Sequence, residues 1–201
     1  MLYILTVCLG IIIGLIMKGR ISNLAEIKIK KVWLIILAFL IQAVARIIGA
    51  KGIQMPAESA IVIQLAVFLL MAACFWFNRY YSGMVFIGIG YLMNTVVMAA
   101  NGGRMPVSEK VLAATSISHF IDNIKTGKDI KHVIMNSGTK MKFLADIIPI
   151  PGFLGSMMQV VSIGDLVILV GIFILTVELV TGRKIFGTND RKQDFGADDI
   201  K

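Results

Sequence analysis

Residues 84–106, MVFIGIGYLMNTVVMAANGGRMP, join an apolar run of membrane-spanning length to an abrupt polar stop. The run carries no charged side chain up to position 100, and the stop that follows contains Asn101, a pair of glycines and Arg104. A charged, glycine-rich turn beside hydrocarbon is costly unless protein buries it or water reaches it. This stretch therefore predicts a membrane helix that ends in a polar pocket at the edge of the lipid.

Part of the polar stop needs only a helix terminus to account for it. Gly102 and Gly103 fit a helix C-cap in the left-handed conformation, and Pro106 cannot continue a helix. This interpretation accounts for the glycines and the proline. It leaves Asn101 and Arg104 as the side chains that need a partner.

The composition of the whole chain indicates a lipid-solvated protein. Hydrophobic residues make up 57% and charged residues 16% of its 201 residues, against about 45–50% and 25% in soluble domains. The net charge of +8 comes from Lys and Arg residues clustered between apolar runs, which fits anionic lipid headgroups better than nucleic acid. Cys8 and Cys74 fall inside apolar runs, so neither a disulfide framework nor a cysteine metal site is supported.

Hydropathy predicts an all-α integral membrane protein with five transmembrane helices, in a single domain of residues 1–187. The predicted spans are Leu2–Met17, Val32–Gly49, Ala60–Phe77, Met84–Ala100 and Ile163–Val180. A span needs roughly 20 apolar residues, so the short first helix is expected to tilt or to pack beneath its neighbours. We expect it to be retained rather than cleaved as a signal peptide, because no basic residue precedes it.

The Lys and Arg residues of the short loops predict an orientation in the membrane. Lys18, Arg79 and Arg183 lie in the first loop, in the third loop and after the last span. Placing these segments in the cytoplasm puts the N-terminus outside and the C-terminus inside. The basic segment 101–161 is then external, and a sixth span within it would change this assignment. Residues 188–201, of mixed charge, are expected to form a disordered cytosolic tail.

The long connection 101–161 is expected to be structured, because structureless loops of more than about 15 residues are uncommon. Residues Val111–Ile124 carry apolar side chains on one helical face and polar ones on the other, which predicts an amphipathic helix in the membrane interface. The apolar stretch from Phe143 is then broken at Pro149 and resumes over Phe153–Val161. This pattern predicts a helix, a break and a second short helix, as in a re-entrant or interfacial hairpin.

The last predicted span begins at Ser162-Ile-Gly-Asp165, which is close to a capping box, although Glu or Gln is the usual fourth residue. In the structural interpretation both side chains bind backbone N–H groups of the first turn. In the functional alternative, Asp165 and the positive end of the helix hold a polar ligand or Arg104. One capping side chain can serve both roles.

Gly90, Asn94 and Asn101 lie on one face of the fourth span, at spacings of four and seven residues. An Asn at mid-bilayer usually bonds across a helix interface, contributing about 0.6–2 kcal/mol, so Asn94 is predicted mainly to hold helices together. Arg46, one turn after Gln42 in the second span, is predicted to extend toward the headgroups. Alternatively, Arg46 could line the same outer pocket.

Four short blocks lie after the first span, after the fourth span, within the long connection and at the start of the last span. They are Gly19-Arg-Ile-Ser-Asn-Leu24, Asn101-Gly-Gly-Arg-Met-Pro-Val107, Ala145-Asp-Ile-Ile-Pro149 and Ser162-Ile-Gly-Asp165. Together these blocks resemble those of an uncharacterised family of small multi-pass membrane proteins from clostridium-like bacteria. The resemblance runs from the first span to the last. It implies a bacterial multi-pass membrane protein of unknown function and assigns no activity.

The sequence lacks the motifs of common catalytic sites, including a nucleophile elbow, a His-Glu-x-x-His helix, a Walker loop and a dinucleotide fingerprint. His119 and His132 are the only histidines of the chain, and they do not share a helix face. They are therefore predicted to be solvated interfacial residues rather than metal ligands. We predict no catalytic residue, no metal and no cofactor.

The leading hypothesis is a non-enzymatic ligand-binding, transport-accessory or sensory membrane protein with a polar outer-leaflet pocket. The predicted pocket residues are Asn94, Asn101, Arg104, His119, Asp146 and Asp165. Arg104 at the membrane edge needs a partner, and the carboxylates of Asp146 and Asp165 flank the proline break. A pair between Arg104 and one of them would close the pocket.

Two alternatives stay open. A membrane enzyme acting on a lipid or isoprenoid phosphate would bind phosphate through Arg104 and use His119, Asp146 or Asp165 as acid or base. A structural subunit would pack its Gly10-x-x-x-Gly14 face and its Met-rich spans against a larger complex or a second copy. Membrane lipids are expected partners, and nucleic acid is not.

Overall fold

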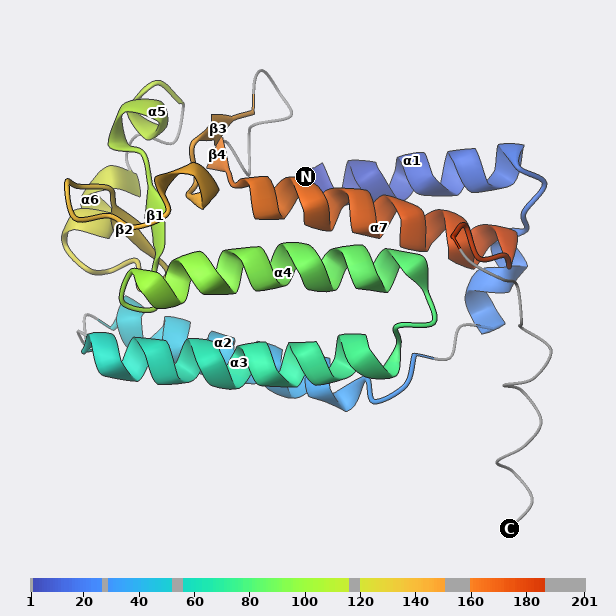
Figure 1. Cartoon of the computed structure of the whole chain (residues 1–201), viewed down its shortest axis with the longest axis horizontal. Helices are drawn as coiled ribbons and strands as arrows, with labels where there is room; N and C mark the ends of the chain where they lie inside the picture. Colours follow the sequence, from blue (N-terminus) through green and yellow to red (C-terminus); the bar gives the residue numbers. More distant parts are fainter. Residues whose placement is uncertain (1, 27–28, 52–55, 116–119, 151–159, 187–201) are drawn as a thin grey trace, which may run out of the picture.

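The computed structural model describes residues 2–26, 29–51, 56–115, 120–150 and 160–186. Long helices lie side by side, and a small cap covers one end of them (Figure 1). The long helices are α1 (Leu2–Ile16), α2 (Trp33–Ala50), α3 (Ala57–Phe77), α4 (Ser82–Ala100) and α7 (Ile163–Thr181), with a 3-10 turn, η1 (Ile21–Glu26), after α1. Each predicted span coincides with one of these helices.

Three of the described helices are long and apolar enough to cross a membrane, namely Glu58–Phe77, Ser82–Ala100 and Ile163–Thr181. The helices Leu2–Ile16 and Trp33–Gly49 are apolar but shorter. At 1.5 Å per residue the 15 residues of α1 reach about 23 Å, less than a hydrocarbon core of about 30 Å. Crossing by all five helices therefore remains a proposal.

The helix α7 lies between α1 and α4, α3 packs on the other side of α4, and α2 packs against α3 (Figure 1). Glycines allow the close contact of α4 with α7. A Cβ atom at Gly90 would lie 2.5 Å from the carbonyl O of Gly164, and one at Gly171 would lie 2.9 Å from the carbonyl O of Gly83. Such close backbone approach lets van der Waals packing hold helices together in lipid.

The glycine face of α1 is also used within the chain. Added Cβ atoms at Gly10 and Gly14 would lie 2.7 Å from the Cβ atoms of Thr176 and Val180 on α7. The structural-subunit alternative placed this face against another protein, whereas here α7 of the same chain covers it.

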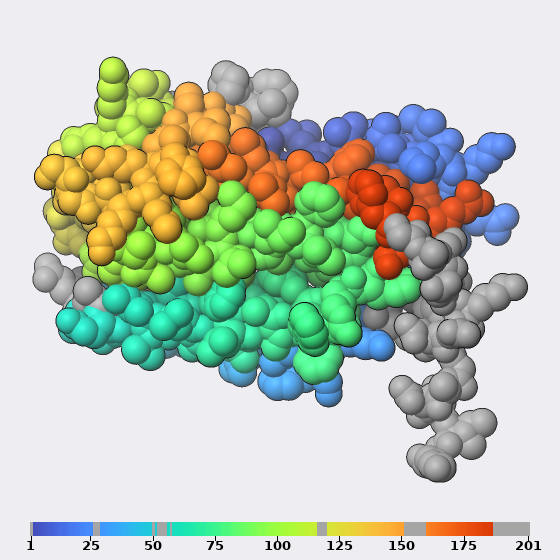
Figure 2. Space-filling model, in the orientation of Figure 1, coloured from blue at the N-terminus to red at the C-terminus, as the bar shows by residue number. Residues whose placement is uncertain are grey.

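The cap consists of short elements that also include strands. They are β1 (Met105–Val107), α5 (Glu109–Ala113), α6 (Phe120–Lys125), β2 (His132–Ile134), the 3-10 turn η2 (Lys142–Leu144), β3 (Ile148–Pro149) and β4 (Val160–Val161). β1 pairs in parallel with β2, while β3 and β4 form an antiparallel pair. Figure 2 shows the cap closing over the end of α4. The all-α expectation thus holds for the long helices but not for the cap.

The single amphipathic helix predicted over Val111–Ile124 is wrong. The structure has two separate short helices, α5 and α6. The hydroxyl of Thr115 donates to the carbonyl O of Leu112 (2.6 Å) and closes the end of α5. Part of the predicted apolar face lies in protein, because Ile121 and Ile124 pack against Val107 of β1, whereas Ala113 and Phe120 are exposed.

The helix-break-helix hairpin predicted after Phe143 is also wrong in its first half. Only η2 is helical there, and Ile148–Pro149 is extended and pairs with Val160–Val161. A proline has no N–H group, which suits a short edge strand better than a helix interior. Residues 151–159, which include most of the predicted second helix, lie outside the described residues, as does the predicted tail 188–201.

Candidate polar site beneath the cap

The N-terminus of α7 carries the first part of the site. The Oγ atom of Ser162 accepts the N–H of Asp165 (3.0 Å), and the Oδ2 atom of Asp165 accepts the N–H of Ser162 (3.0 Å). This reciprocal pair confirms the capping box predicted from the sequence, with Asp in the place of Glu. It leaves the Oδ1 atom of Asp165 for a contact with another helix.

Asn94 of α4 makes that contact. Its Nδ2 atom donates to Asp165 Oδ1 (2.9 Å), and its Oδ1 atom accepts from Ser162 Oγ (2.9 Å). A side chain at Gly164 would overlap the Asn94 amide, so a glycine is required where the two helices meet. The helix-bridging role predicted for Asn94 is confirmed, and it fixes the orientation of the Asp165 carboxylate.

Asp146 supplies the second carboxylate, from an extended segment of the cap. Its N–H donates to the Pro106 carbonyl O (2.9 Å) and its carbonyl O accepts from the Ser108 N–H (3.1 Å), which places the residue beside β1. The side chain is buried, with the residue only 7% exposed. Its Oδ2 lies 3.7 Å from His132 Nε2, while its Oδ1 has no hydrogen-bond partner among the described residues. A buried carboxylate oxygen without a donor costs free energy and is available to a ligand.

His132 of β2 links Asp146 to Asp129. The Nδ1 atom of His132 lies 2.9 Å from Asp129 Oδ2, and Asp129 Oδ1 accepts the N–H groups of Lys131 (2.8 Å) and His132 (3.1 Å). Burial alone would raise the pKa of Asp129, but the His132 contact and the two N–H groups outweigh it and lower the pKa to about 2. Asp129 is therefore ionised at neutral pH and holds the imidazole in place.

The pKa of Asp146 shifts in the opposite direction. Burial raises the pKa of Asp146 to about 7; the charges of His132 and Lys131 oppose this rise and the negative charge of Asp165 adds to it. The fields of both carboxylates also reach the Tyr3 hydroxyl at the start of α1. The structure thus joins Asp146 and Asp165 in one electrostatic unit, in which Asp146 exchanges a proton near neutral pH.

Asn101 has a structural role at the C-terminus of α4. Its Nδ2 donates to the carbonyl O atoms of Val97 (2.7 Å) and Lys140 (3.0 Å), and its Oδ1 accepts the Lys140 N–H (2.9 Å). Gly102 and Gly103 follow with φ angles of 71° and 76°, which confirms the left-handed helix stop. These bonds attach the chain before η2 to the end of α4.

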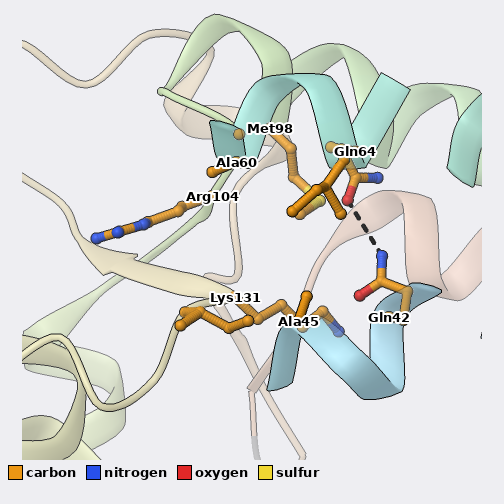
Figure 3. A pocket seen from close by; sticks show the side chains of 10 residues that line it. Gln42, Ala45, Ala60, Gln64, Met98, Arg104 and Lys131 are labelled. Atoms are coloured by element: carbon orange, nitrogen blue, oxygen red, sulfur yellow. Dashed lines mark hydrogen bonds between the residues drawn. The ribbon is translucent and has the colours of Figure 1, made fainter. Parts of the chain in front are cut away.

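Arg104 faces a different part of the molecule. Together with Gln42, Gln64 and Lys131 it lines a cavity of about 30 Å³ between α2, α3 and the cap. Gln42 Nε2 donates to Gln64 Oε1 across the helices (3.4 Å), and Figure 3 shows the Arg104 side chain extending away from this amide pair. The enclosed part of this pocket holds roughly two water molecules.

The predicted pocket residues therefore separate into groups. Asn94, Asp146 and Asp165 come together beneath the cap, whereas Asn101 binds backbone and Arg104 lines the small cavity. The predicted pair of Arg104 with an aspartate is not among the ion pairs of the described residues, where Asp146 is paired with His132. The remaining pocket candidate, at position 119, lies outside the described residues.

The role of His132 was missed by sequence reasoning, which placed this residue in solvent. Its side chain is 27% exposed and lies between the carboxylates of Asp129 and Asp146. The acid three residues earlier in the chain is a weak signal for the first of these contacts. No three His, Cys, Asp or Glu side chains in the described part of the chain are grouped to hold a metal ion.

Glu178 of α7 was also missed. It is fully buried, and its carboxylate accepts the N–H groups of Ser82 (3.1 Å), Gly83 (3.1 Å) and Ile185 (3.0 Å). A lone acid within an apolar span is the sequence signal that could have found it. Its contacts anchor the start of α4 and the chain that follows α7.

The fold and the site define a mostly helical protein with membrane-length helices and a buried carboxylate site beneath a small cap. The chain belongs to a family of unknown function, DUF5317, whose model matches residues 26–177. It is similar to an uncharacterized protein of Thermotoga maritima, at 28% identity over 162 residues that cover 81% of this chain and 83% of the relative. No solved structure matches the chain. Membership of an uncharacterised family, predicted from the polar blocks, is confirmed.

Proposed function

We propose that the protein is a non-enzymatic membrane module that binds a small cationic ligand beneath the cap, in a ligand-binding or sensory role. The observation that carries the proposal is the Oδ1 atom of Asp146, a buried acceptor without a donor among the described residues. Asp165 adds a second negative charge, and Asn94 holds that carboxylate in place. A ligand with N–H donors and a positive charge would satisfy the oxygen and neutralise the pair.

The charges around the site favour a cation over an anion. The carboxylates of Asp129 and Asp146 flank the imidazole of His132, and the charges of Asp165 and Lys131 act on Asp146, so the group holds three carboxylates against one lysine and one imidazole. When the imidazole is neutral, the group has a net negative charge. The field of such a cluster attracts cations and repels phosphate.

Thermal unfolding of the full chain in detergent would test this proposal. Sodium, ammonium and ethanolammonium chloride are compared at constant ionic strength, with Asp146→Asn as the variant and the exposed Asp122→Asn as the matched control. A ligand at 100 times its dissociation constant stabilises by about 2.7 kcal/mol, or several degrees of melting temperature. We expect such a shift with at least one cation in the wild type and the control. No shift with any of them, or an equal shift in Asp146→Asn, would contradict the proposal.

The proposed setting is a bacterial cytoplasmic membrane crossed by α1, α2, α3, α4 and α7, with the cap and N-terminus outside and the C-terminus inside. The segments at the end opposite the cap carry Lys18, Arg20, Lys31, Arg79 and Arg183, which supports a cytoplasmic position for that end. The more basic short loops of membrane proteins face the cytoplasm because positive charge resists translocation.

Labelling of intact cells with a membrane-impermeant maleimide would test the orientation. The exposed residues Ser137 and Ser22 are replaced one at a time, as Ser137→Cys and Ser22→Cys, in a chain that carries Cys8→Ala and Cys74→Ala. We expect labelling at position 137 in intact cells and at position 22 only after lysis. The reverse pattern would invert the orientation.

A lipid-directed enzyme is the second candidate, and the Asp129–His132 contact is the observation that favours it. A carboxylate bound to Nδ1 orients an imidazole so that Nε2 can exchange a proton with a substrate. Here the Nε2 atom faces Asp146 at 3.7 Å, so a second carboxylate occupies the direction of a substrate. Lipid extracts of cells with wild-type and His132→Asn protein separate the candidates, since an enzyme must change a lipid pool.

A further inference from the structure

The end of the molecule opposite the cap combines fixed cations with aromatic rings. At the turn between α3 and α4, the Arg79 Cζ atom lies 4.4 Å from the ring centroid of Trp76, and Arg79 Nη1 donates to the Trp76 carbonyl O (2.9 Å). The stacking and the hydrogen bond together fix the plane of the guanidinium. An arginine has five N–H donors, so others remain to bind an oxyanion.

Lys184, which follows α7, brings a second cation to the same turn. Its Nζ atom lies 5.0 Å from the ring centroid of Tyr80, the neighbour of Arg79 in the chain. The backbone beside it is anchored, because the N–H of Ile185 donates to the buried Glu178 carboxylate (3.0 Å). Two cations from distant parts of the sequence thus each lie over an aromatic ring of this turn.

Large apolar side chains are exposed beside these cations. Trp76 is 65% exposed, Phe77 48% and Phe186 56%. The position of Phe186 is set by Ser82, whose Oγ donates to its carbonyl O (3.1 Å), and by a ring contact with Phe86 (6.2 Å between centroids). Exposed aromatic rings next to fixed cations suit a molecule that has acyl chains below a negative headgroup.

We propose that an anionic phospholipid binds this aromatic-basic patch, which is formed by Trp76, Arg79, Tyr80, Lys184 and Phe186. The lipid phosphate accepts from the Arg79 guanidinium, the positive charge of Lys184 adds to the attraction, and the acyl chains lie along the Trp76 and Phe186 rings. A zwitterionic lipid would bring its own cation toward two fixed cations, which weakens its binding. The patch lies at the opposite end of the helices from the carboxylate site and does not depend on it (Figure 1).

Native mass spectrometry of the full chain, released from nanodiscs that mix phosphatidylglycerol with phosphatidylcholine, tests the proposal. The variant Arg79→Gln with Lys184→Gln removes both fixed cations. The matched control, Lys18→Gln with Lys31→Gln, removes the same charge from exposed positions at the same end of the molecule. We expect retained phosphatidylglycerol to fall roughly 10- to 30-fold in the variant and less than about threefold in the control. Equal losses in both, or no loss in the variant, would overturn the proposal.

Two further measurements separate a specific phospholipid site from general attraction by positive charge and from binding of a free phosphate ester. Arg79→Lys keeps the charge but loses the flat stacked guanidinium. We expect the phosphatidylglycerol retained by this variant to fall about threefold. Unchanged retention would show that only the general field attracts lipid. Soluble glycerol phosphate at millimolar concentration is not expected to displace the lipid, and displacement would identify a free phosphate ester as the ligand instead.

Discussion

Glu178 and Asp146 are both buried acids, but their surroundings differ. Glu178, near the C-terminal end of α7, is fully buried and accepts from the N–H groups of Ser82, Gly83 and Ile185. Asp146, beneath the cap, is 7% exposed, and its Oδ1 has no hydrogen-bond partner among the described residues. Burial by itself therefore does not separate an anchor from a binding site, whereas the supply of donors does.

The supply of donors follows from the neighbouring backbone. The first N–H groups of α4 have no partner within the helix, so Glu178 satisfies them and faces the positive end of the helix dipole. At the cap, the N–H groups of Asp146 and Ser108 are engaged in strand pairing. They do not reach the Asp146 side chain, and its Oδ1 atom stays available.

Of the substitutions compared, removal of the Glu178 carboxylate should lower the free energy of unfolding most. Glu178→Ala leaves three N–H groups without this acceptor, and each unpaired buried donor costs about 1–3 kcal/mol. We expect the free energy of unfolding in detergent to fall by roughly 3–6 kcal/mol. Glu58→Ala, at an exposed position in the first turn of α3, should cost less than about 1 kcal/mol. Similar losses of unfolding free energy in Glu178→Ala and Glu58→Ala would show that Glu178 is not an anchor.

Asp146→Asn should act in the opposite direction at neutral pH. Burial raises the pKa of Asp146 from 3.8 to about 7, so the folded chain holds a proton that the unfolded chain releases above about pH 4. The contribution of this group is therefore present below pH 4 and is lost as pH rises through about 7. Asn cannot titrate, and we expect it to raise the free energy of unfolding at pH 8 by about 3 kcal/mol.

Unfolding at pH 5 and pH 8 would check this sign. The wild type and the exposed control Asp122→Asn should be more stable at pH 5, and Asp146→Asn should show a much smaller difference. A pH dependence that persists in Asp146→Asn would place the titrating group elsewhere. Below pH 4 the stability should fall in all three proteins, because the pKa of Asp129 is lowered to about 2 and its ionised form is lost there.

The glycine contact between α4 and α7 connects the anchor to the site, and its disruption should have an intermediate effect. A Cβ atom at Gly171 would lie 2.6 Å from the backbone N of Ile87, so Gly171→Ala forces the helices apart at a cost of about 2 kcal/mol. Gly88→Ala is the control on α4, since its nearest new neighbour is the Phe75 ring at 3.5 Å. We expect that control to be neutral or slightly stabilising in a thermal melt. Equal losses would show that close packing is not what joins the two helices.

The smallest effect should come from the cap of α7. Ser162→Ala removes the acceptor of the Asp165 N–H and the bond to Asn94, for a loss of about 1 kcal/mol in unfolding free energy. It leaves the Asp146 carboxylate unchanged, so the stabilisation by a bound cation should persist. Loss of that stabilisation in Ser162→Ala would assign the ligand to Asp165 rather than to Asp146.

The long helices were predictable because they depend on local properties of the chain. Each predicted span coincides with a helix, and α4 ends at Gly102 and Gly103 in the left-handed conformation. Backbone in hydrocarbon must form its hydrogen bonds within its own segment, so a long apolar run is expected to fold as a helix. The capping box at Ser162 and Asp165 is local for the same reason.

The cap was not predictable because its elements form through distant pairings. Met105 pairs with His132, and Val107 bridges to Asp146. Strands of two or three residues carry little periodic signal. An amphipathic pattern does not distinguish packing on protein from packing on a membrane surface, and the tertiary structure packs Ile121 and Ile124 against Val107 of β1.

The sequence by itself determined where the helices run, where they stop, that Asn94 lies at a helix contact and that Asp165 caps the last helix, because these follow from apolar length, helical period and local capping. Only the tertiary structure decided that Asp146 joins Asp165 and His132 while Arg104 lines a separate cavity. The partner of a charged side chain depends on which groups the folded chain brings within a few ångströms. Residue type and spacing along the chain do not show which distant groups the fold brings this close.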